Sequence, residues 1–346
     1  MPLVLQTELL GFPWPTRDPF LFCVHHLDHY PSGDSNMQPP EETRQGRILG
    51  QDFSPQHDFR MYHGKSFPGF PYHPHRGFET ITINRQGIVD HSDSLGGAGR
   101  FGSGDVQWMT AGKGILHSEM FPLVHEDREN TLEIFQIWLN LPASAKMVDP
   151  HFKMLWKNDI PSLEQKDQNG HSSIIQLVAG QFGDHHSPDP TPDSWAADPK
   201  NGVMVLVVEM EPQAELLLPK VDLPEVHRTL YFYKGQELII DDKSLKSGLS
   251  ISVEPSQDLI IKNGAEASEI LVLQGKPINE PVAQHGPFVM NTQQEIQEAF
   301  SDYQRTQFGG WPWPEQEQVH DRKSPRFALH SDGRREVPKS NDHHDN

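Results

Sequence analysis

The sequence contains a single cysteine, Cys23, among its 346 residues. One cysteine excludes an internal disulfide framework and is typical of a reducing compartment such as the cytosol. Because Cys23 lies in an apolar run at residues 20–24, we expect a small buried hydrophobic residue there and not a redox sensor.

Basic charge and long apolar runs are also scarce. The chain has 29 Lys and Arg against 48 Asp and Glu, a net charge of −19, which argues against direct binding to nucleic-acid phosphates. It does not argue against binding a protein that itself binds DNA. No segment approaches the roughly 20 apolar residues of a membrane-spanning helix, and residues 1–10 lack the pattern of a signal peptide. We therefore expect a cytoplasmic protein that binds no membrane.

What the sequence does contain is typical of an all-β globular protein. Closely spaced apolar and alternating segments are separated by glycine-containing turns, which predicts a β-barrel or β-sandwich. The length suffices for two domains. The predicted strands lie near residues 18–22, 78–90, 133–141, 203–209, 215–218, 229–233, 237–240, 259–261 and 269–274.

One helix is predicted late in the chain. Thr292 and Glu295 have the spacing of a capping box, and Ile296, Phe300 and Tyr303 then recur on one helical face. We expect this helix to end at the glycine pair 309–310. Two polar stretches, at residues 30–46 and around 182–201, are predicted to be loops.

Two short segments each carry two metal-competent side chains at positions i and i+2: His-Pro-His at 73–75 and His-Ser-Glu at 117–119. Residues two apart in a β-strand point to the same face, so two such strands side by side would direct three imidazoles and one carboxylate to a common point. The sequence therefore predicts a transition-metal site. Its predicted ligands are His73, His75, His117 and Glu119.

This ligand set suits several metals, because imidazole and carboxylate bind iron, manganese, nickel, copper and zinc alike. Since no thiolate lies nearby, an open site is expected in preference to a closed structural zinc site. Four protein ligands around an octahedral ion leave two positions for water, dioxygen or substrate, as in mononuclear oxygenases.

The other histidines are expected to be ordinary surface or core residues, because they lack a matching partner strand. The second half of the chain offers only scattered histidines, so we predict no second metal there. The histidines in question are His25, His26, His63, His91, His125, His185, His186, His227 and His285.

The residues around the predicted ligands resemble the pirin family. The resemblance rests on the runs at 73–80 (HPHRGFET) and 104–120 (GDVQWMTAGKGILHSEM), with shorter matches at 18–20, 93–96 and 138–142. It covers most of the chain and is strongest between residues 65 and 150.

The resemblance implies a bicupin, with two β-barrel cupin domains and a metal, usually iron, in the N-terminal one only. We expect a metal-binding cupin at 1–180, a C-terminal cupin plus helix at 181–330, and a flexible tail at 331–346. Carried over position by position, the family's ligands fall on the four predicted residues. Fe(2+) is the expected metal, and Mn, Ni, Cu or Zn are compatible.

A second carboxylate competes with Glu119. Cupins at large use the pattern His-x-His-x-x-x-Glu, which would recruit Glu79 because it shares strand parity with His73 and His75. Strand geometry permits either carboxylate. The pirin resemblance favours Glu119.

The resemblance also implies a quercetin 2,3-dioxygenase-like activity on a small aromatic substrate. A flavonol would bind the iron through a deprotonated hydroxyl, dioxygen would attack the ring, and carbon monoxide would leave. Glu119 would be both ligand and general base. The candidate pocket residues are Phe70, Tyr72, Phe78, Trp108 and Met109.

The alternative function is regulatory, because the resemblance also implies members that act through transcription factors or metabolic enzymes. A metal-dependent surface would then be recognised by a protein partner. The chain departs from shorter pirins at residues 30–46 and in a C-terminal extension that contains residues 308–313. That extension is expected to pack on a barrel mouth or to form a subunit contact.

Overall fold

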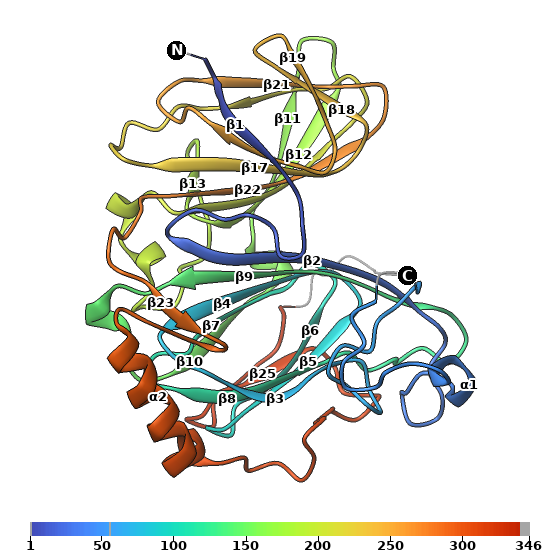
Figure 1. The fold of residues 1–346 in the computed structure, drawn as a ribbon. Helices are drawn as coiled ribbons and strands as arrows, with labels where there is room; N and C mark the ends of the chain where they lie inside the picture. Colours follow the sequence, from blue (N-terminus) through green and yellow to red (C-terminus); the bar gives the residue numbers. More distant parts are fainter. Residues whose placement is uncertain (1, 55–56, 340–346) are drawn as a thin grey trace. The chain divides into compact units, whose positions relative to one another are not determined.

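The computed structural model describes residues 2–54 and 57–339, and the chain divides into two compact units (Figure 1). Unit 1 comprises residues 1–24, 138–140 and 159–279. Unit 2 comprises residues 25–137, 141–158 and 280–346.

These boundaries differ from the predicted ones at residues 180 and 330, for a physical reason. Strand β1 (Val4–Leu9) pairs with β20 (Leu249–Val253), which places the N-terminus in unit 1. At the other end, β25 (Phe327–Leu329) pairs with β6 (Ala98–Gly102), which places the C-terminal segment in unit 2.

Unit 2 contains a six-stranded sheet and most of a five-stranded one, of which residues 20–24 and 138–140 belong to unit 1. The strand orders are β10-β7-β4-β9-β2 and β26-β25-β6-β5-β8-β3. The predicted all-β character is confirmed. The remaining strands are β2 (Phe20–Tyr30), β3 (Gly69–His75), β4 (Phe78–Gln86), β5 (Ile88–Asp93), β7 (Val106–Thr110), β8 (Ile115–Met120), β9 (Asn130–Asn140), β10 (His151–Leu155) and β26 (Arg335–Glu336).

The apolar core of unit 2 draws side chains from both sheets. Val89 and Ile115 come from the six-stranded sheet, whereas Met109, Ile134 and Phe152 come from the five-stranded one. Burial of each such side chain contributes roughly 1.5–3 kcal/mol. The core therefore fixes the strands that carry the predicted ligands.

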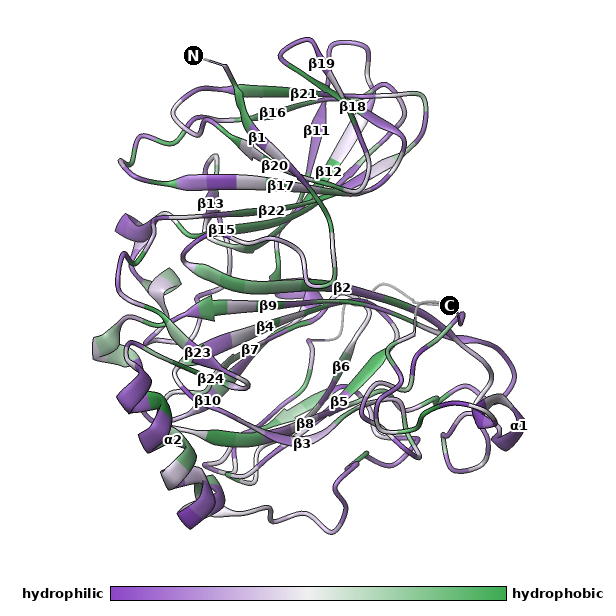
Figure 2. Cartoon of the chain, in the orientation of Figure 1, coloured by the Kyte–Doolittle hydropathy of each residue, from purple (hydrophilic) through white to green (hydrophobic). Residues whose placement is uncertain are grey.

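Unit 1 also contains two sheets, with strand orders β1-β20-β17-β22-β15-β12-β11 and β16-β21-β18-β19. Its buried cluster consists of Val, Ile, Leu, Met, Ala and Phe side chains, and the strands that supply it are drawn largely in green in Figure 2. Its other strands are β11 (Ser162–Lys166), β12 (Ser172–Ala179), β15 (Met204–Met210), β16 (Glu215–Leu218), β17 (His227–Lys234), β18 (Glu237–Ile240), β19 (Lys243–Lys246), β21 (Leu259–Asn263) and β22 (Ser268–Gly275), with a small hairpin of β13 (Gln181–Phe182) and β14 (His185–His186).

The predicted helix is present as α2 (Gln293–Thr306), and its capping box between Thr292 and Glu295 is confirmed. It ends earlier than predicted, because Gln307 already adopts a left-handed backbone with φ of 48°. Its apolar face packs on the hairpin of β23 (Ala283–His285) and β24 (Phe288–Met290). The predicted loop at 30–46 contains only the short helix α1 (Glu41–Arg44).

The predicted tail is partly ordered into a strand. Residues 331–339 are described and include β26, which pairs with β25. Residues 340–346 lie outside the described part of the chain. Across the residues that the structure describes, no helix is long and apolar enough to cross a membrane.

Candidate metal centre

The predicted ligands lie on two adjacent antiparallel strands of unit 2. Strand β3 pairs with β8, and His73 lies directly opposite His117 in the register. An irregularity between Phe70 and His73 shifts the register of β3 just before the first histidine. Both histidines of β3 and the histidine of β8 therefore reach the same face, as the spacing predicts.

The three imidazoles converge. One ring nitrogen from each of His73, His75 and His117 lies within 4.8 Å of the other two. The Nε2 atoms of His73 and His75 are 3.1 Å apart. His75 and His117 are 3% and 0% exposed, whereas His73 is partly exposed and so marks the side from which solvent reaches the group.

The hydrogen bonds made by Nδ1 of His73 and of His75 direct the Nε2 atoms of the two rings at each other. Nδ1 of His73 donates to the carbonyl of Pro71 at 2.9 Å, and Nδ1 of His75 lies 3.4 Å from the carbonyl of Pro287. A carbonyl only accepts, so the proton sits on Nδ1 and the lone pair on Nε2. Burial lowers the pKa of His73 to about 4 and that of His75 well below its usual value, so no second proton relieves the repulsion between the lone pairs.

His117 adds a second indication of a bound cation. Among the residues that the structure describes, neither of its ring nitrogens has a hydrogen-bond partner, although the side chain is fully buried. Burial also holds the pKa of His117 well below its usual range, so the ring is neutral. A buried polar group without a partner costs about 1–3 kcal/mol. Three neutral imidazoles with converging lone pairs fit a transition-metal ion, which would satisfy all of them.

Glu119 lies on β8 two residues after His117, but its carboxylate is not among the converging ligand atoms. Its Oε1 accepts a hydrogen bond from the Thr82 hydroxyl at 2.8 Å, and its Oε2 accepts one from the Gln136 amide at 3.1 Å. Both partners lie in the five-stranded sheet. Burial raises the pKa of Glu119, and the bond from Thr82 opposes that shift.

Glu79 lies in the other sheet of unit 2, on β4. It is fully buried, and its Oε1 accepts a hydrogen bond from the hydroxyl of Thr110, directly opposite on β7, at 2.7 Å. Within the described residues, neither Glu79 nor Glu119 belongs to the group of converging ligand atoms.

The structure adds a pair of residues that the sequence interpretation passed over. Strand β5 pairs with the other side of β8, so that His91 lies opposite Glu119 and Asp93 lies opposite His117. Nε2 of His91 is 3.2 Å from the Asp93 carboxylate. His91 was expected to lack a partner strand; the spacing His-x-Asp at 91–93 resembles that of the two ligand segments and could have identified it.

The predicted pocket residues take different positions. Phe70 and Phe78 contact the histidines, with ring centroids 6.3 Å from His73 and 4.9 Å from His75. Met109 lies in the apolar core of unit 2, and Trp108, its neighbour along β7, points to the opposite face of the sheet. Tyr72 stacks on Trp311.

A separate cavity of about 210 Å³ opens in unit 2 away from these histidines. Its lining includes Tyr30, Phe121 and Leu132, with His125 and Arg128 among its polar members. It contains none of the four predicted ligands.

Comparisons with known proteins agree with this picture of two β-domains. A family model described as Pirin matches residues 16–139, and one described as Pirin C-terminal cupin domain matches residues 205–309. A Pseudomonas aeruginosa protein that carries the provisional name quercetin 2,3-dioxygenase is 36% identical over 240 residues, covering 69% of this chain and 79% of the relative.

Two further similarities concern a plant relative and a solved structure. Pirin-1 of Arabidopsis thaliana is 38% identical over 247 residues, covering 70% of this chain and 78% of its own. A crystal structure of quercetin 2,3-dioxygenase from Acinetobacter baumannii covers 90% of this chain and 99% of its own, with a TM-score of 0.69 and 26% identity.

Proposed function

Since the chain belongs to the pirin family of bicupin proteins, we propose that it is a metal-dependent dioxygenase that acts on flavonol-type substrates. The observation that carries the proposal is the convergence of His73, His75 and His117 on one point. The names of the bacterial relative and of the Acinetobacter baumannii structure support the choice of substrate class.

The three imidazoles would hold the metal, which we propose to be Fe(2+), with manganese, nickel, copper or zinc as compatible alternatives. When bound, the ion would supply open positions at which dioxygen and a deprotonated substrate hydroxyl can meet. The Nδ1 donors of His73 and His75 already orient their rings, which is the usual arrangement around a metal-binding histidine.

Glu119 is proposed as the fourth ligand and as the acceptor of the substrate hydroxyl proton. Each carboxylate oxygen has two lone pairs, so the hydrogen bonds from Thr82 and Gln136 occupy only part of its accepting capacity and fix its orientation. A pKa raised by burial makes it a stronger proton acceptor. Phe70 and Phe78 place apolar rings beside the histidines and limit the access of water.

The activity is tested with protein loaded anaerobically with iron, mixed with quercetin and then exposed to oxygen. The proposal expects oxygen-dependent loss of the flavonol absorption and release of carbon monoxide. His117→Phe is the matched control, because it removes one ligand and keeps an aromatic ring. Loss of absorption at the same rate in both proteins, or in neither, would remove the proposed activity.

The choice of carboxylate is tested separately by metal content. Glu119→Ala is expected to lower the iron bound per chain, whereas Glu79→Ala is expected to retain it. If Glu119→Ala retained its full metal content, Glu119 would not be the fourth ligand.

The regulatory alternative stays a prediction. Its test is a comparison of the proteins captured by the ferrous and the ferric forms of the whole chain. Identical partners in both states would count against a redox-dependent interaction.

A further inference from the structure

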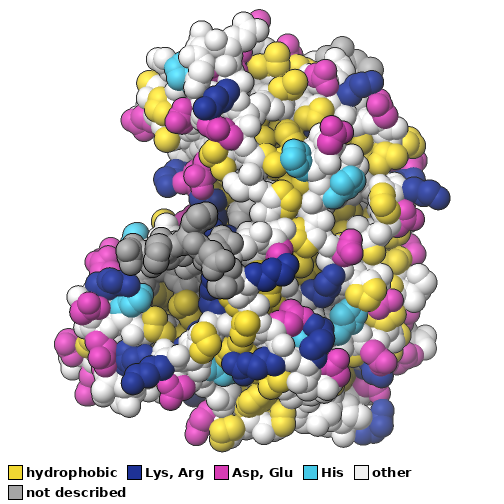
Figure 3. Space-filling model, turned by 180° about the vertical axis from the view of Figure 1, so that it is seen from behind, with side chains coloured by type: hydrophobic (Ala, Val, Ile, Leu, Met, Phe, Trp, Pro, Cys, Tyr) yellow, Lys and Arg dark blue, Asp and Glu magenta, His cyan; other side chains and the backbone are white. Residues whose placement is uncertain are grey.

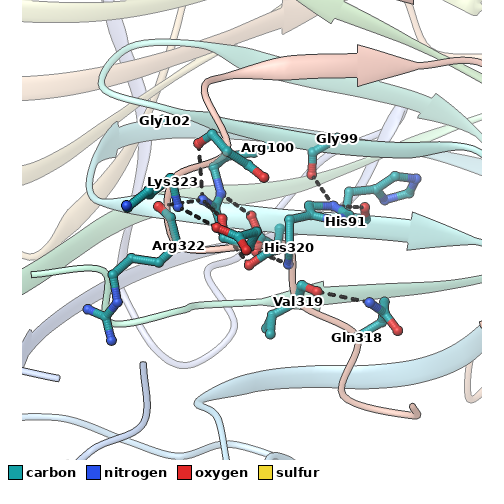
Figure 4. A network of polar contacts seen from close by, with 12 residues as sticks. His91, Gly99, Arg100, Gly102, Gln318, Val319, His320, Arg322 and Lys323 are labelled. Carbon is teal, nitrogen blue, oxygen red and sulfur yellow. Dashed lines mark hydrogen bonds and ion pairs between the residues drawn. The ribbon is translucent and has the colours of Figure 1, made fainter. Parts of the chain in front are cut away.

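The C-terminal segment at residues 313–324, here called the strap, crosses strands that flank the metal centre. It follows the part of the chain that the C-terminal family model matches, which ends at residue 309. Figure 4 shows its central contacts, which involve β5 and β6 of the six-stranded sheet.

Arg100 on β6 joins the strap to β5. Its Nε and Nη2 donate to the two carboxylate oxygens of Asp90 on β5, each at 2.7 Å. The rest of the guanidinium donates to strap carbonyls between 2.8 and 3.3 Å away (Figure 4). Because Arg100 is only 2% exposed, its charge and donors must be satisfied inside the protein, and the strap does this. The accepting carbonyls belong to His320, Asp321, Arg322 and Ser324.

Two strap side chains bind the backbone of β5 itself. The ring Nε2 of His320 lies 3.1 Å from the carbonyl oxygen of His91 on β5 and at the same distance from that of Gly99 on β6. The indole N–H of Trp313 donates to the carbonyl of Asp93 at 2.8 Å. His91 and Asp93 are the residues of β5 that lie opposite Glu119 and His117 on β8.

The strap also binds the chain on the other side of β8. The backbone N–H of Tyr72, next to His73, donates to the carbonyl of Gln316 at 3.1 Å. The Glu317 carboxylate accepts three backbone N–H groups from residues 65–67, just before β3, between 2.8 and 2.9 Å. The strap therefore binds β5, the segment just before β3 and the middle of β3, and β8 lies between β5 and β3 in the sheet order.

We propose that the strap positions the metal centre by holding β3 and β5 against β8, so that the three imidazoles and Glu119 keep the spacing that the ion requires. This inference rests on the metal centre of the proposed function but not on its reaction. Ligand sets bind tightly only when their supporting residues are fixed, and loss of one such support costs about 10–100-fold in metal affinity.

The chain offers matched pairs of variants for the test. Trp313→Phe removes the bond to Asp93, whereas Trp311→Phe removes a bond from the indole to the carbonyl of Glu315, within the extension itself. Arg100→Lys keeps the charge but loses both the two-pronged pairing with Asp90 and most of the hydrogen bonds to the strap carbonyls. Its control is Arg322→Lys, a substitution within the strap whose side chain binds neither β3 nor β5, because it donates to the carbonyls of residues 34 and 124.

The measurement is the affinity of the metal-free full chain for Fe²⁺ under anaerobic conditions, by competition with a chelator. We expect roughly tenfold weaker binding in Trp313→Phe and Arg100→Lys, and binding within about twofold of the wild type in both controls. Hydrogen exchange of the metal-free chain supplies a second readout. Amides of β5 and β8 should lose protection in Trp313→Phe and Arg100→Lys but not in the two controls.

The possible outcomes distinguish failure of the strap's role from failure of the metal centre. Equal affinities in a strap variant and its control, with the wild type binding Fe²⁺, overturn this inference alone. A wild type that binds no Fe²⁺ overturns the metal centre and this inference together. Should Arg100→Lys fail to fold, the pair of tryptophan variants still decides, because each removes one hydrogen bond and keeps an aromatic ring.

Discussion

At the scale of single residues, the three histidines form a group that is unfavourable without an ion. His117 is fully buried, and neither of its ring nitrogens has a partner within the described part of the chain. The Nε2 atoms of His73 and His75 lie 3.1 Å apart. Such costs persist in natural proteins where function requires them. The histidines should therefore reduce the stability of the metal-free protein.

We therefore expect His117→Phe to stabilise the metal-free protein. The substitution removes two unpartnered polar atoms and keeps an aromatic ring, so the free energy of unfolding should rise by about 1 kcal/mol. Urea denaturation of metal-free wild type and variant measures the change, with Glu79→Gln as a control at another buried polar position. If the substitution instead lowered the free energy of unfolding by more than about 1 kcal/mol, the two nitrogens of His117 would not be unfavourable in the metal-free protein.

The burial of His73 predicts a pH dependence of stability. Its pKa falls from 6.5 to about 4 in the folded protein, so between these values the unfolded chain binds more protons than the folded one. The unfolding free energy of the metal-free protein should therefore decrease as the pH is lowered through this window and be unaffected by this group above it. Because His73 is partly exposed, the loss is on the order of 2 kcal/mol. In His73→Asn the unfolding free energy should decrease less between pH 7 and pH 4 than in the wild type. An equal decrease would show that His73 does not cause the pH dependence.

The sequence predicted the three converging imidazoles because strand parity alone places them on one face. It could not predict the orientation of Glu119, since that depends on Thr82 and Gln136 from another sheet. The His-x-Asp spacing at 91–93 marks His91 and Asp93 as a pair on one strand face, but the position of that pair beside β8 depends on long-range strand pairing.

At the scale of secondary-structure elements, the sequence predicts those helices and strands whose own residues stabilise them, through a cap or an apolar pattern. The capping box of Thr292 and Glu295 starts α2 where the sequence predicts it. The apolar strands of unit 1 lie at the predicted positions to within a few residues. Several strands with polar or mixed sequences, such as β11 and β19, were not predicted, because pairing with neighbours and not their own pattern stabilises them.

The capping box predicts a defined loss on mutation. Thr292→Ala removes the bond from the Glu295 N–H to the threonine hydroxyl and should cost about 1 kcal/mol of stability. Thr292→Ser retains the hydroxyl and should cost less. Thermal or urea unfolding measures both, and equal losses would show that the hydroxyl does not stabilise the helix. Neither variant is expected to change metal affinity, because α2 carries none of the proposed ligands.

At the scale of the whole molecule, the two units differ in the kinds of side chain that they bury. Both units bury some polar side chains, such as Arg228 and Gln274 in unit 1, but among the described residues the buried histidines all lie in unit 2. Domain boundaries were the least predictable feature, because β1 and β25 each pair with strands far away in the sequence. On the face drawn in Figure 3, lysine and arginine side chains are scattered among acidic ones, in keeping with the net charge of −19.

This difference predicts that a metal stabilises the two units unequally. An ion that binds only the folded form contributes about 2.7 kcal/mol at a free concentration 100 times its Kd. In hydrogen exchange with and without Fe²⁺, amides of β3 and β8 should gain protection, whereas amides of β15 and β22 in unit 1 should not. A gain in unit 1 as large as in unit 2 would contradict a metal centre confined to unit 2.

The central claim is that His73, His75 and His117 together bind one transition-metal ion. Its most direct test is the metal content of the whole chain, determined by elemental analysis and electron paramagnetic resonance on protein expressed without added metal, for the wild type and for a variant with all three histidines changed to alanine. The account predicts close to one ion per wild-type chain and none in the variant. A wild type without bound metal, or a variant that retains it, would contradict the account.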